Sequence, residues 1–574
     1  MSVSAATAVT AGITPELFSA PRSRALSRTV IVSTLVLIIS LGFGFRAYRL
    51  SAEGLSEDEL NKLHAVEDYR RRGLTSTNGE HPMLMKALLT GSVVVAQRWN
   101  ATGVAQSSPT LTVAPETALR LPAIIFGALT SLLIFLVVAE LFGPVTGLIA
   151  ATLWAVDPQA VGFNRIAKED TFLLFFFLLA NVFWLRGQRV AELGRGRPEP
   201  YFWATAAAFG AMLASKYLPH LLAVSVSYYH IFQSIPRTRW RVGKRKWLIF
   251  FGVMGAAFVA CNLTILMPAT WHEMRIFAGE RRIGHDSYEF MGQLYRNQMT
   301  LWLKGSPWYF YYAFMAFKLP PAVLAAFALG LPLLFRRRLG DGRYFVLFWM
   351  FYWFFPFTLL GGKFLRYFTL GLPVVHITAA IGITFIGEWV AGIAQDGAQA
   401  ARKSAFSGYA QACLVGALII SSAYAALGSA PHYRLYTNFL GGGPARAGDY
   451  FPHDEFYDGS VRETAQAIAR LATPGATVFS ETPGLLTHYA RLAGRDDLIS
   501  VSLSDPAARR ALVPNDFVVV ARGRRYFSND LFVRKLESVA RPVAEVAAGE
   551  VPAVRLYRLD QQTHAALASS VDNR

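Results

Sequence analysis

Runs of apolar residues recur along this chain, and many are about as long as a bilayer's hydrocarbon core is thick. Clear examples are 29–48, 118–140 and 344–361. A helix of roughly 20 apolar residues crosses a bilayer, and it satisfies its own backbone hydrogen bonds there. The chain is 53% hydrophobic and only 16% charged, which suits a membrane protein better than a soluble one of this size. We therefore predict an α-helical polytopic membrane protein.

Basic residues gather in four clusters between the apolar runs, within 22–28, 186–197, 237–246 and 336–343. Because cytoplasmic loops are enriched in Lys and Arg, we place all four clusters in the cytoplasm. An even number of spans must then separate each cluster from the next. This parity predicts about eleven transmembrane helices, at 29–48, 118–140, 145–163, 170–185, two within 201–235, 247–267, about 320–335, 344–361, 367–390 and 407–428.

The apolar segment 83–99 contains Lys86, Gln97 and Arg98, and counting it as a span would break the parity. We predict instead a helix that lies along the outer surface. The resulting orientation places the N-terminal tail 1–28 in the cytoplasm. It exposes three outer loops on the other side, at 49–117, 164–170 and 268–306.

The composition changes from about residue 430, where short β-like runs such as ATVFS and DFVVVARG alternate with helical ones such as VRETAQAIARLA. Such alternation indicates a small α/β domain, which the orientation places outside the cytoplasm, at 430–574. We find no residue set in it that can be assigned to chemistry. The domain either guides an acceptor or caps the outer face.

The net charge of +18 raises the question of nucleic-acid binding. The basic residues lie where topology signals belong, and no recognised binding motif accompanies them, so we predict no nucleic-acid partner. Cys261 and Cys413 lie far apart in apolar runs, which favours buried free thiols over a disulfide or a metal site.

The predicted outer face gathers ionisable residues that are expensive near hydrocarbon and tend to mark a functional cavity. The carboxylates are Asp58, Glu59, Glu169 and Asp170, and the cations and histidines are Lys86, Arg165, Lys216, Lys363, Arg366, His81 and His285. A carboxylate serves as general base toward a hydroxyl or amine acceptor. Cations stabilise a phosphate that leaves an anomeric carbon. The set therefore suits glycosyl transfer from a phosphate-linked donor.

Each residue of this set also has a purely structural interpretation. Acids at 58–59 and 169–170 suit the first turns of helices, and His81-Pro82 suits a turn that opens a helix. Lys86 suits a snorkelling position on an interfacial helix, while Lys216 and Arg366 suit interface anchors. The segment GHDSYEFMG lacks recognised metal-ligand spacing, so we predict no metal site there.

The order of the motifs is more specific than any one of them. The pair DE at 58–59, HPMLMK at 81–86, RIAKED at 165–170, ASKY at 214–217 and KFLRYFTLGLP at 363–373 follow one another along the chain. In this order they resemble the dolichyl-phosphate-mannose protein mannosyltransferase superfamily, which includes bacterial relatives of the lipid A aminoarabinose transferase. The similarity covers roughly residues 29 to 390 and implies the membrane GT-C glycosyltransferase fold.

The resemblance implies a role for each matching residue. Asp58 would be the base, supported by Glu59, and Asp170 would belong to the catalytic set. His81, Lys86, Arg165, Lys216, Lys363, Arg366 and Tyr367 would surround the donor phosphate, and His285 lies in a stretch similar to the substrate-facing loop of bacterial relatives. Met83 stands where the family has a second proline.

These arguments predict a GT-C catalytic domain at 29–429 in a bacterial inner (plasma) membrane. The resemblance implies an inverting transfer from a polyprenyl-phosphate sugar without a catalytic metal or other cofactor. The acceptor would be a protein hydroxyl, lipid A or a surface glycan. A transporter or flippase of a lipid-linked sugar is the alternative, although we find no repeat that would indicate one. The sequence does not indicate the sugar or the oligomeric state.

Overall fold

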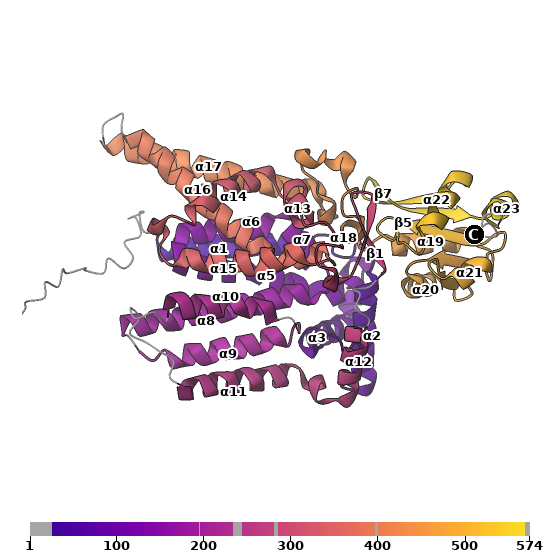
Figure 1. Ribbon diagram of the computed structural model, residues 1–574, viewed down its shortest axis with the longest axis horizontal. Helices are drawn as coiled ribbons and strands as arrows, with labels where there is room; N and C mark the ends of the chain where they lie inside the picture. The colour runs from indigo at the N-terminus through magenta and orange to yellow at the C-terminus, as the bar shows by residue number, and fades with distance from the viewer. Residues whose placement is uncertain are drawn as a thin grey trace, which may run out of the picture.

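A helical bundle and a smaller α/β region make up the computed structural model, with the α/β region at one end of the bundle (Figure 1). The structure describes residues 26–194, 196–217, 219–233, 244–279, 285–395 and 400–568. The basic residues expected at 22, 24, 195, 237, 239 and 241, and most of the tail 1–28, lie outside the described residues.

Each predicted span contains at least one helix. α8 packs against α9, α9 against α11, α5 against α6, and α14 against α16. The bundle helices are α1 (Arg28–Ala47), α5 (Pro115–Phe142), α6 (Pro144–Val156), α7 (Pro158–Asn164), α8 (Glu169–Leu193), α9 (Glu199–Leu213), α10 (Leu222–Tyr228), α11 (Lys244–Cys261), α14 (Pro321–Leu333), α15 (Gly342–Leu359), α16 (Leu372–Gln395) and α17 (Ala400–Ser429).

Among the described residues, four helices are long and apolar enough to cross a membrane by themselves. They are Arg28–Ala47, Pro109–Phe142, Glu169–Leu193 and Leu372–Val390. The remaining expected spans are shorter or more polar helices, so the number of eleven spans stays a prediction. The polytopic helical fold class itself is confirmed.

Two turns in the bundle follow from proline and glycine. Gly143 adopts φ +94° and Pro144 opens α6, so these two residues form the turn between α5 and α6. The expected span 145–163 is divided into two helices at Asp157-Pro158. The Asp157 carboxylate accepts a hydrogen bond from the Ala160 amide at 2.8 Å and so caps α7.

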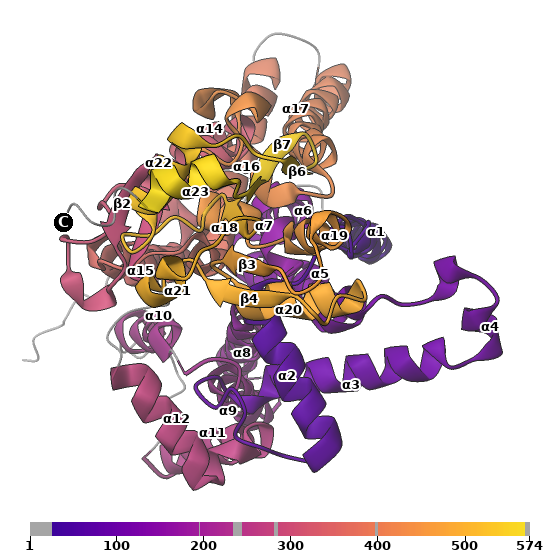
Figure 2. The ribbon, with the colours of Figure 1, turned by 90° about the vertical axis from the view of Figure 1, so that its right-hand side faces the viewer.

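Several short elements lie at the end of the bundle nearest the α/β region. α3 (Met83–Asn100) runs across the bundle axis and projects sideways, as expected for a surface helix (Figure 2). The other elements here are α2 (Glu57–Arg72), α4 (Gly103–Gln106), α12 (Pro268–Gly279), α13 (Phe310–Lys318) and the antiparallel hairpin of β1 (Ser287–Phe290) and β2 (Gln293–Arg296).

The predicted C-terminal α/β region is confirmed. Its sheet has the order β4-β3-β5-β7-β6, with β3 parallel to β4 and β5, and β7 antiparallel to β5 and β6. The strand β6 was not expected from the sequence. The elements are α18 (Pro452–Phe456), α19 (Val461–Leu471), β3 (Thr477–Ser480), α20 (Pro483–Leu492), β4 (Ile499–Ser502), α21 (Pro506–Arg510), β5 (Phe517–Ala521), α22 (Asp530–Val539), β6 (Ala544–Ala548), β7 (Val551–Arg558) and α23 (Gln561–Ala568).

The α/β region shares a hydrophobic core with α2 and α3. Polar contacts reinforce this junction: Arg434 pairs with Glu53 at 2.7 Å, and the Tyr489 hydroxyl donates to Glu116 at 3.0 Å. The α/β region is therefore attached to the end of the bundle that carries the DE and HPMLMK motifs of the expected first outer loop.

The two cysteines form no disulfide, as expected. Their predicted burial is wrong for Cys413, which is exposed on α17, while Cys261 is partly exposed at the end of α11. An apolar helix face that would meet lipid is exposed in the isolated chain, so a thiol on it need not be packed inside the protein.

Candidate active site

A cavity of about 430 Å³ lies where the bundle meets the α/β region. Ligand sites of small molecules commonly have volumes of a few hundred Å³. Its ionisable walls come from distant parts of the chain: Glu57, Asp58, Lys62, Glu80, His81, Lys168, Glu169, Asp170, Lys216, His285, Arg366, His453, Asp458 and Arg524.

Asp58 lies in the first turn of α2, whose start is fixed by a reciprocal cap. The Ser56 hydroxyl accepts from the Glu59 amide at 3.2 Å, and the Glu59 carboxylate accepts from the Ser56 amide at 3.0 Å. With Glu59 held in this cap, the neighbouring carboxylate, Asp58, lines the cavity. Its side chain stays 36% exposed, so a ligand has access to it.

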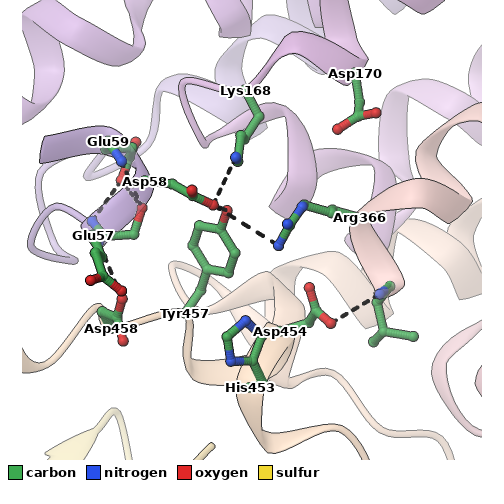
Figure 3. A network of polar contacts seen from close by, with 12 residues as sticks. Glu57, Asp58, Glu59, Lys168, Asp170, Arg366, His453, Asp454, Tyr457 and Asp458 are labelled. Atoms are coloured by element: carbon green, nitrogen blue, oxygen red, sulfur yellow. Dashed lines mark hydrogen bonds and ion pairs between the residues drawn. The ribbon is translucent and has the colours of Figure 1, made fainter. Parts of the chain in front are cut away.

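Three groups converge on one oxygen of Asp58 (Figure 3). The Lys168 ammonium lies 2.7 Å from Oδ2, the Tyr457 hydroxyl donates to Oδ2 at 2.6 Å, and the Arg366 guanidinium lies 3.9 Å away. Burial would raise the pKa of Asp58, but Lys168 and Arg366 and the two hydrogen bonds hold it well below its ordinary value. Asp58 is therefore a carboxylate at neutral pH.

A second group of charges lies at the start of α8. Glu169 pairs with Lys62 at 2.9 Å and with the Nδ1 atom of His81 at 3.3 Å, while Asp170 pairs with Lys216 at 2.6 Å. Acids in the first turn of a helix also suit its dipole. This local preference and the ion pairs together fix both carboxylates at the cavity wall.

The histidine of this group is neutral. Burial lowers the pKa of His81 well below its ordinary value, and the nearby charges of Lys62 and Lys168 lower it further, although Glu169 opposes them. His81 can therefore accept or donate one hydrogen bond within the cavity without adding charge.

Arg366 lies in the short helical turn η7 (Leu365–Leu370), between aromatic rings. Its guanidinium lies 4.1 Å from the Phe364 ring centroid and 6.0 Å from that of Tyr457. Burial lowers the pKa of Arg366, but Tyr457 and Asp58 raise it above its ordinary value, so the group stays charged. Such a flat, fixed cation suits a phosphate ligand.

The α/β region supplies residues that the sequence did not indicate. His453, Tyr457, Asp458 and Arg524 line the cavity, so the expectation that no residue of 430–574 could be assigned to chemistry is corrected. Tyr457 and Asp458 adopt φ +47° and +60°, which is uncommon for residues with side chains. The acidic stretch DEFYDG at 454–459 was the available signal.

Asp458 links the α/β region to the start of α2. Its Oδ2 accepts from the Glu57 amide at 3.1 Å (Figure 3). Its Oδ1 accepts from the Arg524 Nε at 2.7 Å. Arg524 also lies 3.2 Å from the Glu57 carboxylate. The turn that carries Asp58 is therefore bound directly by residues from the other end of the chain.

The cavity brings together seven of the predicted site residues: Asp58, Asp170, His81, Lys216, His285, Arg366 and Tyr367. His285 stacks on Tyr526 with ring centroids 4.1 Å apart, and its Nε2 lies 2.6 Å from Arg524. The other four, Glu59, Lys86, Arg165 and Lys363, do not line it.

Glu59 and Lys86 hold the backbone around the cavity. Glu59 is fully buried, pairs with Arg120 at 2.7 Å and accepts from the Ala167 amide at 3.0 Å. Lys86 is also fully buried, and its ammonium donates to the Thr77 and Asn78 carbonyls. These positions correct the expected contact of Lys86 with a donor phosphate and make the support from Glu59 structural.

Arg165 and Lys363 likewise bind backbone oxygens. Arg165 donates to the carbonyls of Arg46, Tyr48 and Arg49 at 2.7–2.9 Å, which shapes the chain just before α2. Lys363 donates to the Ser306 carbonyl at 2.9 Å and to the Leu360 carbonyl. Their expected place beside the donor phosphate is corrected, because a buried cation is satisfied here by carbonyl groups.

One solved structure of low sequence identity reaches a TM-score of 0.50, and two others are similar to this chain at lower scores. The apo oligosaccharyltransferase of Archaeoglobus fulgidus matches at a TM-score of 0.50 and 12% identity, over 87% of this chain and 70% of that one. ArnT from Cupriavidus metallidurans, bound to undecaprenyl phosphate, matches at 0.47 and 13% identity, over 92% and 98%. The S. cerevisiae Pmt1-Pmt2 protein O-mannosyltransferase complex, bound to its sugar donor, matches at 0.32 and 16% identity, over 47% and 36%.

The fold places the chain in the class of GT-C membrane proteins. Its residues 104–265 match the family of dolichyl-phosphate-mannose-protein mannosyltransferases, which confirms the resemblance predicted from the sequence motifs. A search of curated protein sequences finds no significant match. The family and the four long apolar helices identify an integral membrane protein.

Proposed function

We propose that this chain is an inverting membrane glycosyltransferase, which moves a sugar from a polyprenyl-phosphate donor to an acceptor outside the cytoplasm. The observation that carries the proposal is the convergence in one cavity of an ionised, reachable carboxylate, Asp58, with the cations of Lys168, Lys216 and Arg366. The family match, to enzymes named for a dolichyl-phosphate sugar donor, supports the same donor class.

Asp58 acts as the general base in this mechanism. Its carboxylate takes the proton from an acceptor hydroxyl or amine as the acceptor atom attacks the anomeric carbon. The bond between that carbon and the donor phosphate oxygen breaks on the opposite face, so the configuration inverts. The bonding electrons leave with the polyprenyl phosphate. A strong pairing with Lys168 keeps Asp58 ionised before the acceptor arrives.

The cations stabilise the negative charge that develops on the leaving phosphate. Arg366 and Lys216 line the cavity from two different elements, and Tyr367 lies between them, with the Lys216 ammonium 5.0 Å from its ring centroid. Fixed cationic groups stabilise the negative charge of a leaving phosphate, as a divalent metal ion does at other phosphate sites, so the proposal involves no metal.

The proposal includes a location and an orientation. The chain would lie in a bacterial inner membrane, with its N-terminus in the cytoplasm and the cavity and α/β region outside. The supporting observation is that the end of α8 and the start of α9, which flank a basic cluster, lie at the bundle end opposite the α/β region (Figure 1).

The test is reconstitution of the full chain in vesicles with a labelled polyprenyl-phosphate sugar and extracted cell-envelope acceptors. We expect the label to appear in a new glycosidic bond on a protein or glycolipid, with polyprenyl phosphate released in equal amount. Movement of the intact labelled lipid between leaflets, with no new bond, would instead establish the flippase alternative.

A further inference from the structure

A second cavity, of about 610 Å³, lies beside the candidate active site. It is lined by the tip of the β1–β2 hairpin, the segment before α18, strands β5 and β7, and α22, and it is open to solvent on one side. Neither the family match nor the proposed transfer step assigns it a role. Its volume is in the range of cavities that hold a ligand the size of one or two sugar rings.

Arginine dominates the ionisable residues of this cavity. Five arginines line it, against three carboxylates: Arg446, Arg522, Arg524, Arg525 and Arg555. A planar guanidinium presents two parallel donors to phosphate or carboxylate, which makes arginine the preferred side chain for binding such anions.

Positive charge exceeds negative charge around Asp449. Arg446 and Arg522 both pair with Asp449, at 3.0 Å to Oδ2 and 2.6 Å to Oδ1, so two cations share one carboxylate. Their side chains are 59% and 33% exposed. Arg446 is therefore open to a ligand, whereas Arg522 is partly open, because its Nη1 also reaches the Pro552 carbonyl at 3.5 Å. The two cations share one carboxylate, so one positive charge is left to be balanced.

A tight turn at Gly523 connects the Arg446/Arg522 pair to the active site. Gly523 has φ +81°, and a Cβ atom there would lie 2.5 Å from the backbone of His453, which lines the active-site cavity. On either side of Gly523, Arg522 faces the second cavity and Arg524 lines both. Arg524 in turn pairs with Glu57, the residue before Asp58.

We propose that the second cavity binds the acceptor of the transfer reaction, and that this acceptor is an anionic saccharide carrying phosphate or carboxylate groups. The anion lies against Arg446 and Arg522, and the attached saccharide extends past Arg524 so that its hydroxyl reaches Asp58. The inference deepens the proposed function and rests on it for the acceptor role, but not for anion binding. The saccharide is either a glycolipid headgroup or a soluble oligosaccharide.

Binding is tested first, without any transfer. Inorganic pyrophosphate is titrated calorimetrically into the full chain with undecaprenyl phosphate present in excess, so that the donor phosphate site is blocked. We expect Arg446→Glu/Arg522→Glu to weaken pyrophosphate binding at least tenfold. The control Arg491→Glu replaces an exposed, ion-paired arginine of the same region outside both cavities, and should change pyrophosphate binding less than twofold. Equal binding by all three proteins, or none by the wild type, overturns the proposal.

Transfer is tested second, with phosphorylated glycolipid, soluble phosphorylated oligosaccharide and acidic peptide as acceptors. For a phosphorylated saccharide, we expect the kcat/KM of the double variant to be at least tenfold lower than that of the wild type. After phosphatase treatment of the acceptor, the two proteins should have similar kcat/KM values. The rate of donor hydrolysis by water should be unchanged in the double variant. The preferred saccharide then identifies the source. Wild-type transfer that the double variant leaves unchanged, or preference for the acidic peptide, would overturn the proposal. No transfer or donor hydrolysis by the wild type would instead count against the proposed function.

Discussion

The Tyr457 hydroxyl offers the sharpest test of how the cavity controls its base. Tyr457→Phe removes the hydrogen bond of 2.6 Å to Asp58 Oδ2 and leaves the ring in place. A hydrogen bond to a charged group contributes about 1.5–3 kcal/mol. Because 36% of the Asp58 side chain is exposed, we use the lower end, about 1.5 kcal/mol, which is roughly a tenfold gain in the affinity of Asp58 for a proton.

The sign of the pH effect follows from the direction of the pKa shift. The pKa of Asp58 is held well below its ordinary value, and the lost hydrogen bond makes it less depressed. The acidic limb of the kcat/KM profile should therefore move to higher pH in Tyr457→Phe. Because the wild-type limb lies below the ordinary Asp pKa of about 3.9, rates are measured from the lowest pH at which the protein stays folded up to neutral pH. Tyr295→Phe, whose hydroxyl donates to Gln293, is the control. An unmoved limb, or one moved to lower pH, refutes the reasoning.

Three further predictions concern the supports of the cavity. Arg120→Met leaves the buried Glu59 carboxylate without its partner and should cost about 3–5 kcal/mol, seen in thermal unfolding; a loss below 1 kcal/mol would contradict this. Burial lowers the pKa of Lys86 to about 7, so the native protein binds fewer protons than the unfolded chain above that pH, and stability should rise from pH 7 to 10. The melting temperature of Lys86→Met should lack this rise, and an identical slope would count against it. Gly523→Ala forces a Cβ to within 2.5 Å of His453 at a positive φ, and should lower both stability and transfer, whereas unchanged values would show that the turn adapts.

The sequence predicted the architecture because bilayer-length apolar runs admit few folds. It also predicted seven of the residues that line the cavity, because ionisable residues of the expected outer loops are costly near hydrocarbon. It did not single out Lys168, which pairs with Asp58. Counting spans from the positive-inside rule does not, however, predict where a helix ends within an apolar segment. Only the Asp157 cap and Pro158 divide α6 from α7.

Topology places a residue on a face but does not set the direction of its side chain. Lys86 and Arg165 lie close in sequence to residues that line the cavity. Their side chains nevertheless donate hydrogen bonds to backbone carbonyls instead of pointing into it. Tyr457 and Arg524 could not be found from spacing, because Tyr457 meets Asp58 across 399 residues of chain and Arg524 meets Glu57 across a still longer separation. Such long-range pairing has no local sequence signal.

The most direct test of the central claim is the single-turnover rate of sugar transfer by Asp58→Asn at saturating donor. Loss of a general base predicts a rate lower by about 10²–10⁴-fold, with donor affinity within a few-fold of the wild type. Glu67→Gln, on the same helix but outside the cavity, should transfer normally. A near-normal transfer rate for Asp58→Asn would contradict the account.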